Sequence, residues 1–316
     1  MKKKMNIVPF NDIYYKTCFY NPLFSSIIWY NKKFDSLIMN ESFFYSIDEN
    51  SFLGITVSSK RTFEEKEILD RIGIKLSKIE VKENEFINFI KDRVDHDVPL
   101  MIEIDSFLYP RINYYVNGDK STHYVMITGY DDEKRIFHII ESINETKEEV
   151  VDYDLLIKCY FSLNNANLFM ILNIEQNFNK AEENIRKMFI DIYSKLRHVL
   201  SDSLHFLDIA KNRIRSFDSG MLRKIEDNPE ELFYEFQKII HIKQIEKYKS
   251  NYLFDDSFDL NYDRIIEKWN MIKNLIIKYT LLNDNVLLER AVLILDEIKT
   301  SENELLGLLD ASFDNK

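Results

Sequence analysis

The sequence predicts an α+β domain at residues 1–174, followed by an all-helical domain at residues 175–316. The first part holds four of the five prolines and four of the six glycines, and its apolar runs are short with β character. The second part contains long stretches in which apolar side chains recur at helical spacing. A chain of 316 residues is long enough for two domains of this kind.

The charge distribution argues against nucleic-acid and membrane partners. The formal net charge is -11 and is spread evenly, with 21 Lys+Arg against 27 Asp+Glu up to residue 173 and 21 against 26 after it. Phosphate binding needs a concentrated cationic surface, which this pattern does not supply. The basic start of the chain leads into no apolar region typical of a signal peptide, and no apolar run reaches the length of a membrane span. We therefore expect a cytoplasmic location.

Two cysteines, Cys18 and Cys159, are too few for a disulfide framework in a chain of this size. The six histidines are scattered, and none pairs with a cysteine at metal-ligand spacing. The sequence therefore predicts free thiols with neither a metal nor another cofactor. Cys159 lies in an apolar segment at residues 154–160, which we assign to the core.

Each element of the first domain follows from a local pattern. Apolar residues on one face predict a helix at residues 22–33, with Pro22 in its first turn, and further helices at 64–71 and 83–93. Apolar runs predict strands at 98–104, 123–130, 135–140 and 167–174, with a turn at 131–134 that makes the middle pair a hairpin. Helices that precede an antiparallel sheet along the chain are typical of the α+β class.

Three apolar stripes at helical spacing predict the core of a bundle in the second domain, at residues 185–199, 265–279 and 287–298. A capping box at residues 301–304 predicts the start of a final short helix. The helices are expected to roof the cleft of the first domain, to form a homodimer, or to receive a partner protein.

Three residues in the first domain suggest covalent chemistry. Cys18 precedes a predicted helix, His123 begins a strand, and Glu141 ends the next, antiparallel strand. A helix N-terminus and a nearby imidazole favour the thiolate that attacks a carbonyl carbon, and a third polar group orients the imidazole. Each residue alone has an ordinary structural explanation, so the prediction rests on their joint placement.

The order of these segments resembles a known fold. The C39-type papain-like cysteine protease fold has a similar order of segments. In this sequence the order is Cys18 with its helix, a strand, His123–Asp131, a hairpin with an acid, and a final strand. More closely, Asp105–Pro110 followed by His123 and Gly129–Asp131 resembles the N-terminal domain of the butirosin biosynthesis protein H family, over about residues 8–174.

The resemblance implies acyl transfer in natural product biosynthesis. In such an enzyme a cysteine takes an acyl group from the thioester of an acyl carrier protein and passes it to an amine acceptor, forming an amide. The family's nucleophile and base correspond to Cys18 and His123.

Two positions depart from the C39-type pattern. Asp12 stands six residues before Cys18, where a glutamine usually donates to the oxyanion. Asn11 is the expected replacement, together with the Cys18 backbone N–H. Glu141 followed by serine stands where Asp-Pro is usual, and its longer side chain still reaches an imidazole.

The register of the predicted hairpin decides whether Glu141 reaches His123. If Tyr130 pairs with Arg135, His123 lies opposite Ser142, and Glu141 shares its face only with an odd-length loop or a bulge near residues 131–134. Asn144 is the alternative orienting residue.

Asp105, Tyr114 and Tyr115 lie between the central strand and His123, and we expect them to form one wall of the cleft. Asp105 either attracts an amine substrate or caps the end of its strand.

Three functions remain open from the sequence. The first is a cysteine-dependent N-acyltransferase, or amide synthase, with Cys18 as nucleophile. The second is a cysteine peptidase or thioesterase with the same residues, in which water attacks. The third is a binding module without enzymatic activity, in which the thiol is inert.

Overall fold

The computed structural model describes residues 1–109, 122–142, 145–174 and 181–314. Tyr114, Tyr115 and Asn144 lie outside the described residues. The chain divides into two compact units. We call Met1–Leu37 with Phe63–Ala181 the sheet unit, and Ile38–Thr62 with Glu182–Lys316 the helical unit. The division differs from two consecutive segments because residues 38–62 pack with the helices that follow much later in the chain.

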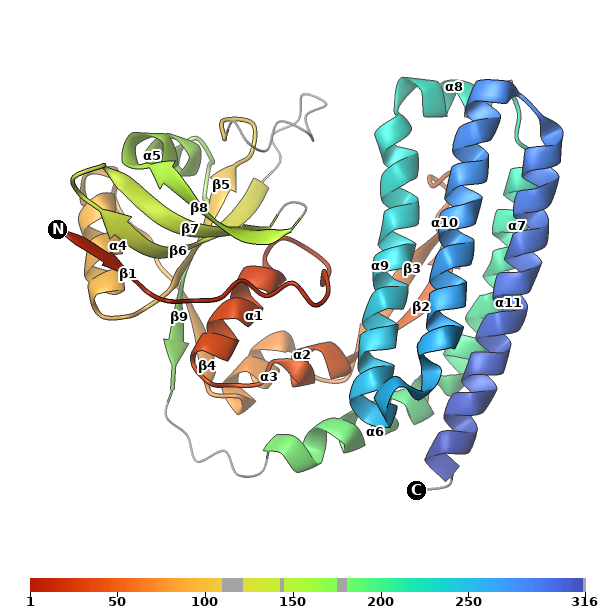
Figure 1. Ribbon diagram of the computed structural model, residues 1–316, viewed down its shortest axis with the longest axis horizontal. Helices are drawn as coiled ribbons and strands as arrows, with labels where there is room; N and C mark the ends of the chain where they lie inside the picture. The colour runs from red at the N-terminus through yellow and green to blue at the C-terminus, as the bar shows by residue number, and fades with distance from the viewer. Residues whose placement is uncertain (110–121, 143–144, 175–180, 315–316) are drawn as a thin grey trace. The chain divides into compact units, whose positions relative to one another are not determined.

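The sheet unit combines helices with a single large sheet (Figure 1). Its elements are β1 (Lys2–Lys4), α1 (Tyr20–Trp29), α2 (Asp35–Met39, reaching into the helical unit), α3 (Glu65–Arg71), β4 (Ile74–Lys78), η1 (Glu83–Glu85), α4 (Phe86–Asp95), β5 (Leu100–Asp105), β6 (Thr122–Asp131), β7 (Ile136–Ser142), β8 (Thr146–Asp152), α5 (Tyr153–Phe161) and β9 (Leu168–Asn173). The expected helices and strands are present here within a few residues of their predicted ends.

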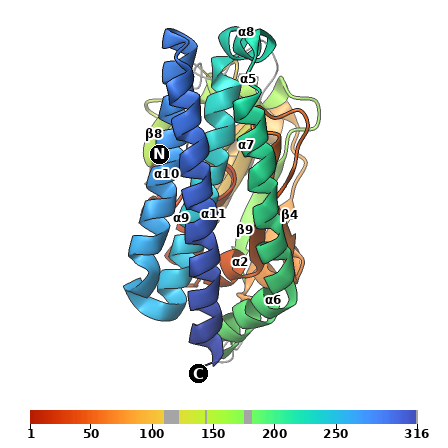
Figure 2. The same cartoon turned by 90° about the vertical axis from the view of Figure 1, so that its right-hand side faces the viewer.

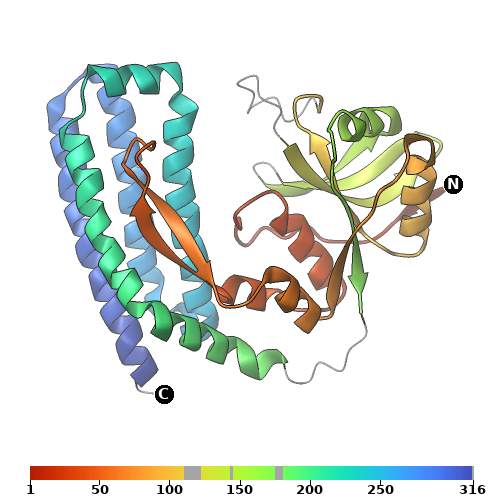
Figure 3. The same ribbon diagram turned by 180° about the vertical axis from the view of Figure 1, so that it is seen from behind.

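In the described residues the sheet has seven strands in the order β4-β9-β5-β6-β7-β8, and β1 pairs with β6. The pairs are antiparallel. Helix α1 lies on one side of the sheet and α5 on the other (Figures 1 and 3). Because both faces are covered, β6 is buried at consecutive positions from Val125 to Tyr130. The mixed helix-and-antiparallel-sheet class predicted from the sequence is confirmed.

A β-bulge interrupts the β6–β7 pairing between Ile127 and Gly129. Ile127 pairs with Ile139 before the bulge, and Gly129 pairs with His138 after it. Thr128 is the extra residue and is fully buried. Its carbonyl oxygen accepts the Met5 N–H at 2.7 Å, and its hydroxyl donates to the His138 carbonyl oxygen at 3.3 Å. The bulge therefore lies inside the strand rather than beside the turn at residues 131–134.

Gly129 is required where β1 crosses beside β6. Lys4 of β1 pairs with Gly129, and a Cβ at this glycine would lie 2.6 Å from the Lys3 carbonyl oxygen and 2.8 Å from the Lys4 Cα. Distances this short exclude a side chain unless the backbone moves. The N-terminal strand is thus held directly against the residue that follows the bulge.

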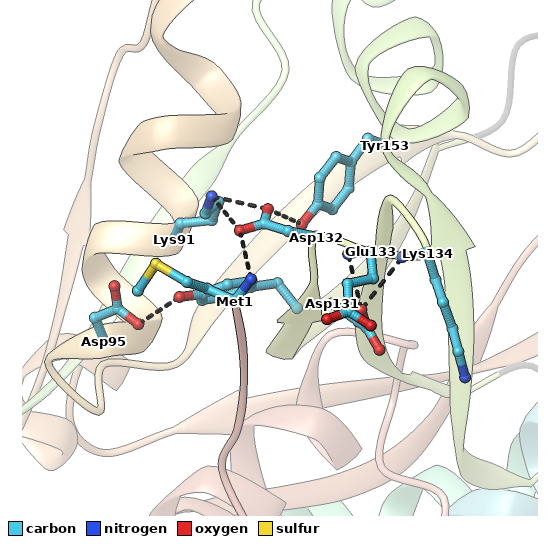
Figure 4. A network of polar contacts seen from close by, with 9 residues as sticks. Met1, Lys91, Asp95, Asp131, Asp132, Glu133, Lys134 and Tyr153 are labelled. Carbon is cyan, nitrogen blue, oxygen red and sulfur yellow. Dashed lines mark hydrogen bonds and ion pairs between the residues drawn. The ribbon is translucent and has the colours of Figure 1, made fainter.

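The β6–β7 turn is anchored by a network of charged and polar groups (Figure 4). Lys91 of α4 donates to both Asp132 carboxylate oxygens at 2.8 Å, and the Tyr153 hydroxyl donates to Asp132 Oδ1 at 3.1 Å. The hydrogen bond from Lys91 holds the pKa of Asp132 below its usual value. Asp131 Oδ1 accepts the N–H groups of Glu133 and Lys134, which closes the turn.

The helical unit contains long helices that run side by side (Figure 2). Its elements are β2 (Glu41–Ile47), β3 (Ile55–Arg61), α6 (Ala181–Ser203), η3 (Leu204–Phe206), α7 (Leu207–Arg215), α8 (Ser219–Asp227), α9 (Pro229–Phe254), η4 (Asp255–Phe258), α10 (Asp259–Leu282) and α11 (Asn285–Asp314). The predicted short helix starting at residues 301–304 is wrong, because these residues continue α11 without a break. Packing of the helix against its neighbours overrides the local capping signal. None of the helices in the described ranges combines the length and apolarity needed to cross a membrane.

The β2–β3 hairpin packs on the helices of this unit (Figure 3). Seven consecutive residue pairs join its two strands, from Glu41 with Arg61 to Ile47 with Ile55. Glu235 of α9 accepts the Phe52 N–H at the hairpin turn, and burial raises the pKa of this carboxyl to about 7. This hairpin is not among the elements predicted from the sequence.

We predict that Gly129→Ala destabilises the protein by about 1–3 kcal/mol, because the added methyl group meets the β1 backbone. Gly307→Ala is the control, since an added Cβ at this helical position meets nothing within 4 Å. The control is expected to be neutral or to stabilise by up to about 1 kcal/mol. Urea unfolding of the variants measures both effects, and equal stabilities of the two variants would contradict the proposed close approach of β1.

Candidate active site

Cys18 lies in the turn that leads into α1, as the sequence predicts, and its side chain is partly exposed. The sulfur accepts a hydrogen bond from the Tyr124 backbone N–H at 3.4 Å. This contact joins the residue just before α1 to the first residues of strand β6, which are more than 100 residues apart in the chain.

The loop before Cys18 is fixed by side chains of α1. The Asn21 amide donates to the carbonyl oxygens of Phe10 and Ile13, and its oxygen accepts the Tyr15 N–H. Ser25 accepts the Phe10 N–H at 2.9 Å. Both α1 residues are buried, so the loop that precedes Cys18 is attached to a rigid helix. Cys18 is therefore held by this loop on one side and by α1 on the other.

His123 and Glu141 meet on one face of the sheet. His123 Nε2 lies 3.1 Å from Glu141 Oε1, and the two side chains are 8% and 4% exposed. Successive side chains of a strand point to opposite faces, so a shift of one residue would place Glu141 on the other face. The bulge at Thr128 supplies that shift, which is why an acid at position 141 rather than 142 reaches the imidazole.

Cys18 is near enough to His123 to raise the pKa of the imidazole, as Glu141 does. Burial lowers the pKa of His123, but its interactions with the Cys18 and Glu141 side chains outweigh burial and raise it to about 9. At neutral pH the ring is therefore an imidazolium between two acidic groups.

Asn11 occupies a different place from the one expected for an oxyanion donor. Its amide nitrogen donates to the Thr146 carbonyl oxygen, and its oxygen accepts the Thr146 N–H, both at 2.7 Å. The side chain thus pairs with the backbone at the start of β8. The Cys18 backbone N–H makes no hydrogen bond within the described residues, and it remains the available oxyanion donor at the start of α1.

Asp105 caps the end of β5, which is one of its two expected roles. It is 2% exposed, and its carboxylate accepts the Phe107 N–H at 2.9 Å and the Ser162 hydroxyl at 3.2 Å. It therefore presents no free carboxylate to a substrate. The positions of Tyr114, Tyr115 and the alternative orienting residue Asn144 lie outside the described residues. Cys159 is fully buried, as predicted.

Sequence reasoning missed an aromatic and polar group beside Cys18. The Phe19 ring lies 5.1 Å from the Tyr124 ring and 6.1 Å from the Phe169 ring, edge to face in both pairs. Asn167 donates to the Tyr124 hydroxyl at 3.1 Å and to Glu103 at 2.6 Å. The sequence offers one signal for this group, because Phe19 follows Cys18 and Tyr124 follows His123 in the chain. The Phe169 ring joins them only through the pairing of strands in the sheet.

The fold and the site together define an α+β domain in which a histidine hydrogen-bonded to a carboxylate lies beside a cysteine. Residues 38–142 match the family model described as butirosin biosynthesis protein H, N-terminal. The family resemblance suggested by the sequence is thereby confirmed over this stretch, which includes His123 and Glu141 and begins after Cys18. A search of curated proteins found no match. The family match indicates a biosynthetic enzyme of this type.

We predict a pH-dependent contribution of His123 to stability. Its pKa rises from 6.5 to about 9 on folding, so protonation stabilises the folded state. The contribution, up to roughly 3 kcal/mol, is complete below the unfolded pKa and is lost as the pH rises through the folded pKa.

The measurement is the difference in unfolding free energy between the wild type and His123→Gln, by urea titration from about pH 6 to pH 10. The difference should shrink toward the alkaline end. A difference that stays constant over this range would contradict the raised pKa.

Proposed function

We propose that this protein is a cysteine-dependent N-acyltransferase that forms an amide in natural product biosynthesis. The observation that carries the proposal is the hydrogen bond between His123 and Glu141 beside Cys18, whose sulfur accepts the N–H of Tyr124, the residue after His123. The match to a biosynthesis protein family over residues 38–142 supports a biosynthetic role. The acyl donor in this proposal is a carrier-protein thioester, and the acceptor is an amine.

The reaction has two halves. In the first, the Cys18 thiolate attacks the thioester carbonyl carbon, the C–S bond to the carrier breaks, and the carrier thiol leaves with the proton from His123. In the second, the amine attacks the Cys18 thioester, His123 takes a proton from the amine nitrogen, and the amide departs as the Cys18 sulfur is released. Exchange between two thioesters costs little free energy, so the enzyme's task is to orient the groups and to favour the amine over water.

The surroundings of Cys18 support acyl transfer more than hydrolysis. Phe19 follows Cys18 in the chain, and its ring packs edge to face against the rings of Tyr124 and Phe169. Aromatic surface disfavours attack by water on a bound acyl group. The Asn11 amide is occupied by Thr146, so the side-chain oxyanion donor typical of C39-type peptidases has no counterpart there. A peptidase or thioesterase with the same three residues is the alternative.

The partners follow from the proposed chemistry. The donor is an acyl carrier protein, which delivers its substrate on a long flexible thiol and so needs an accessible nucleophile, in agreement with the partial exposure of Cys18. The setting proposed for this exchange is the cytoplasm, with no nucleic acid or membrane involved. A homodimer is proposed as the assembly, on the basis of the long apolar-striped helices.

We predict that the protein forms a covalent acyl adduct at Cys18 when it is incubated with an N-acetylcysteamine or carrier-protein thioester. Intact mass spectrometry detects the adduct, and peptide mapping locates it. Cys18→Ala should abolish it, whereas Cys159→Ala, the matched control at the other, fully buried cysteine, should retain it.

Addition of an amine separates the outcomes. Release of the acyl group as an amide supports the acyltransferase, and release only as the free acid supports the hydrolase instead. If no adduct forms on the wild-type protein with either donor, the covalent mechanism is wrong.

A further inference from the structure

The helical unit contains a cavity with a volume of about 70 Å³, several times what a single water molecule needs. Its wall comes from strand β2, from helices α6, α9, α10 and α11 and from η3, all of which belong to this unit. Such a wall, mostly apolar with a few convergent polar groups, is typical of small-molecule sites. The apolar and aromatic side chains of the wall are Phe43, Phe44, Tyr45, Phe189, Tyr193, Leu200, Leu204, Leu305, Leu306 and Leu309.

The charged side chains of the wall are balanced against one another. Lys243 Nζ donates to Glu246 Oε2 at 2.9 Å and to Glu302 Oε2 at 2.8 Å. Lys249, the other lysine of the wall, donates to the Glu41 carbonyl oxygen. Among the described residues that line the cavity, two lysines therefore stand against two carboxylates. A charged ligand would lose its hydration without gaining an unpaired partner of opposite charge, so the cavity favours a neutral ligand.

Two hydroxyl groups of the wall are left without a hydrogen-bond partner in the part of the chain that the structure describes. Ser250 is 2% exposed, and its Oγ is buried and makes no hydrogen bond there. Tyr262 is 5% exposed, and its hydroxyl likewise makes none within the described ranges. Buried polar groups almost always have partners. Two such hydroxyls on one cavity therefore point to a ligand that hydrogen-bonds to them.

The two hydroxyls lie on the polar side of the cavity. Ser250 follows Glu246 by four residues and Lys243 by seven, so the three side chains share one face of α9. Burial and then the nearby Glu246 carboxylate raise the pKa of Tyr262, which shows that this hydroxyl is close to the same cluster. A hydroxyl that can donate and a carboxylate that can only accept thus lie near each other. A hydroxyl group of a ligand, which accepts and donates at once, matches both.

We propose that this cavity binds a small uncharged alcohol with a short aliphatic chain. The ligand hydroxyl accepts a hydrogen bond from Tyr262 and donates one to Glu246, and Ser250 supplies a further hydroxyl beside them. The aliphatic chain lies against the leucine and phenylalanine side chains of the wall, where water would gain no hydrogen bonds. The proposal does not rest on the reaction proposed for Cys18, since every residue that it uses belongs to the helical unit.

Methyl NMR of the full-length protein, titrated with n-butanol, tests the proposal. The leucine methyl signals of the wall should shift saturably with a single dissociation constant. Butylammonium and butyrate carry the same chain with a positive or a negative charge, and each should bind at least about tenfold more weakly. If n-butanol causes no saturable shift, the cavity holds only water and the proposal is overturned. Equal or tighter binding of either ion would overturn it as well.

Two variants that each remove one hydroxyl locate the ligand. Tyr262→Phe should weaken n-butanol binding at least about threefold, because one hydrogen bond is lost. Ser250→Ala should weaken it by a similar factor, and it keeps the test available if Tyr262→Phe does not fold. Tyr234→Phe is the matched control at a position of α9 that is 67% exposed, and it should bind as the wild type does. Unchanged affinity in both cavity variants, with methyl spectra otherwise like that of the wild type, would contradict the assignment.

Discussion

The candidate site depends on one irregularity, the β-bulge at Thr128. With the pairing that β6 and β7 have near their turn, where Tyr130 faces Phe137, Glu141 would lie on the face opposite to His123. The extra residue changes the register by one and brings both side chains to the same face. Its buried carbonyl group is not left unpaired, because the Met5 N–H binds it at 2.7 Å. The segment next to β1 therefore helps to maintain the contact between imidazole and carboxylate.

Residues that resemble a family signature serve here mainly as supports. Gly129 admits the β1 backbone, the Tyr130 hydroxyl donates to Asp95 of α4 at 2.8 Å, and Asp131 closes the turn. These contacts fix the β6–β7 hairpin at the end away from His123. Because the hairpin is anchored at that end and carries the bulge in its middle, Glu141 lies close enough to His123 for the ion pair to form. The proposed chemistry resides in Cys18, His123 and Glu141, and these neighbours fix the geometry of His123 and Glu141.

The sequence predicts the three site residues because each sits at the end of an element with a clear local signal. It does not locate the bulge, since Thr128 continues an apolar run without any break in pattern. It assigns Asn11 to an oxyanion site, whereas the contact with Thr146 depends on two segments 135 residues apart. The hairpin at residues 41–61 escapes prediction for a related reason, because its burial comes from helices that follow much later in the chain. Local periodicity thus gives the elements, and long-range packing decides the register and the role of each polar side chain.

The central claim is that a protonated His123 bridges Cys18 and Glu141 at neutral pH. An NMR titration of the His123 ring, assigned by comparison with His123→Gln, measures this directly. The account predicts a pKa of about 9 in the wild type and a value below the ordinary 6.5 when Cys18→Ala and Glu141→Gln are combined, because burial then acts alone. A wild-type ring that titrates at or below 6.5 would show that burial dominates. In that case the ion pair, and the thiolate chemistry built on it, would be contradicted.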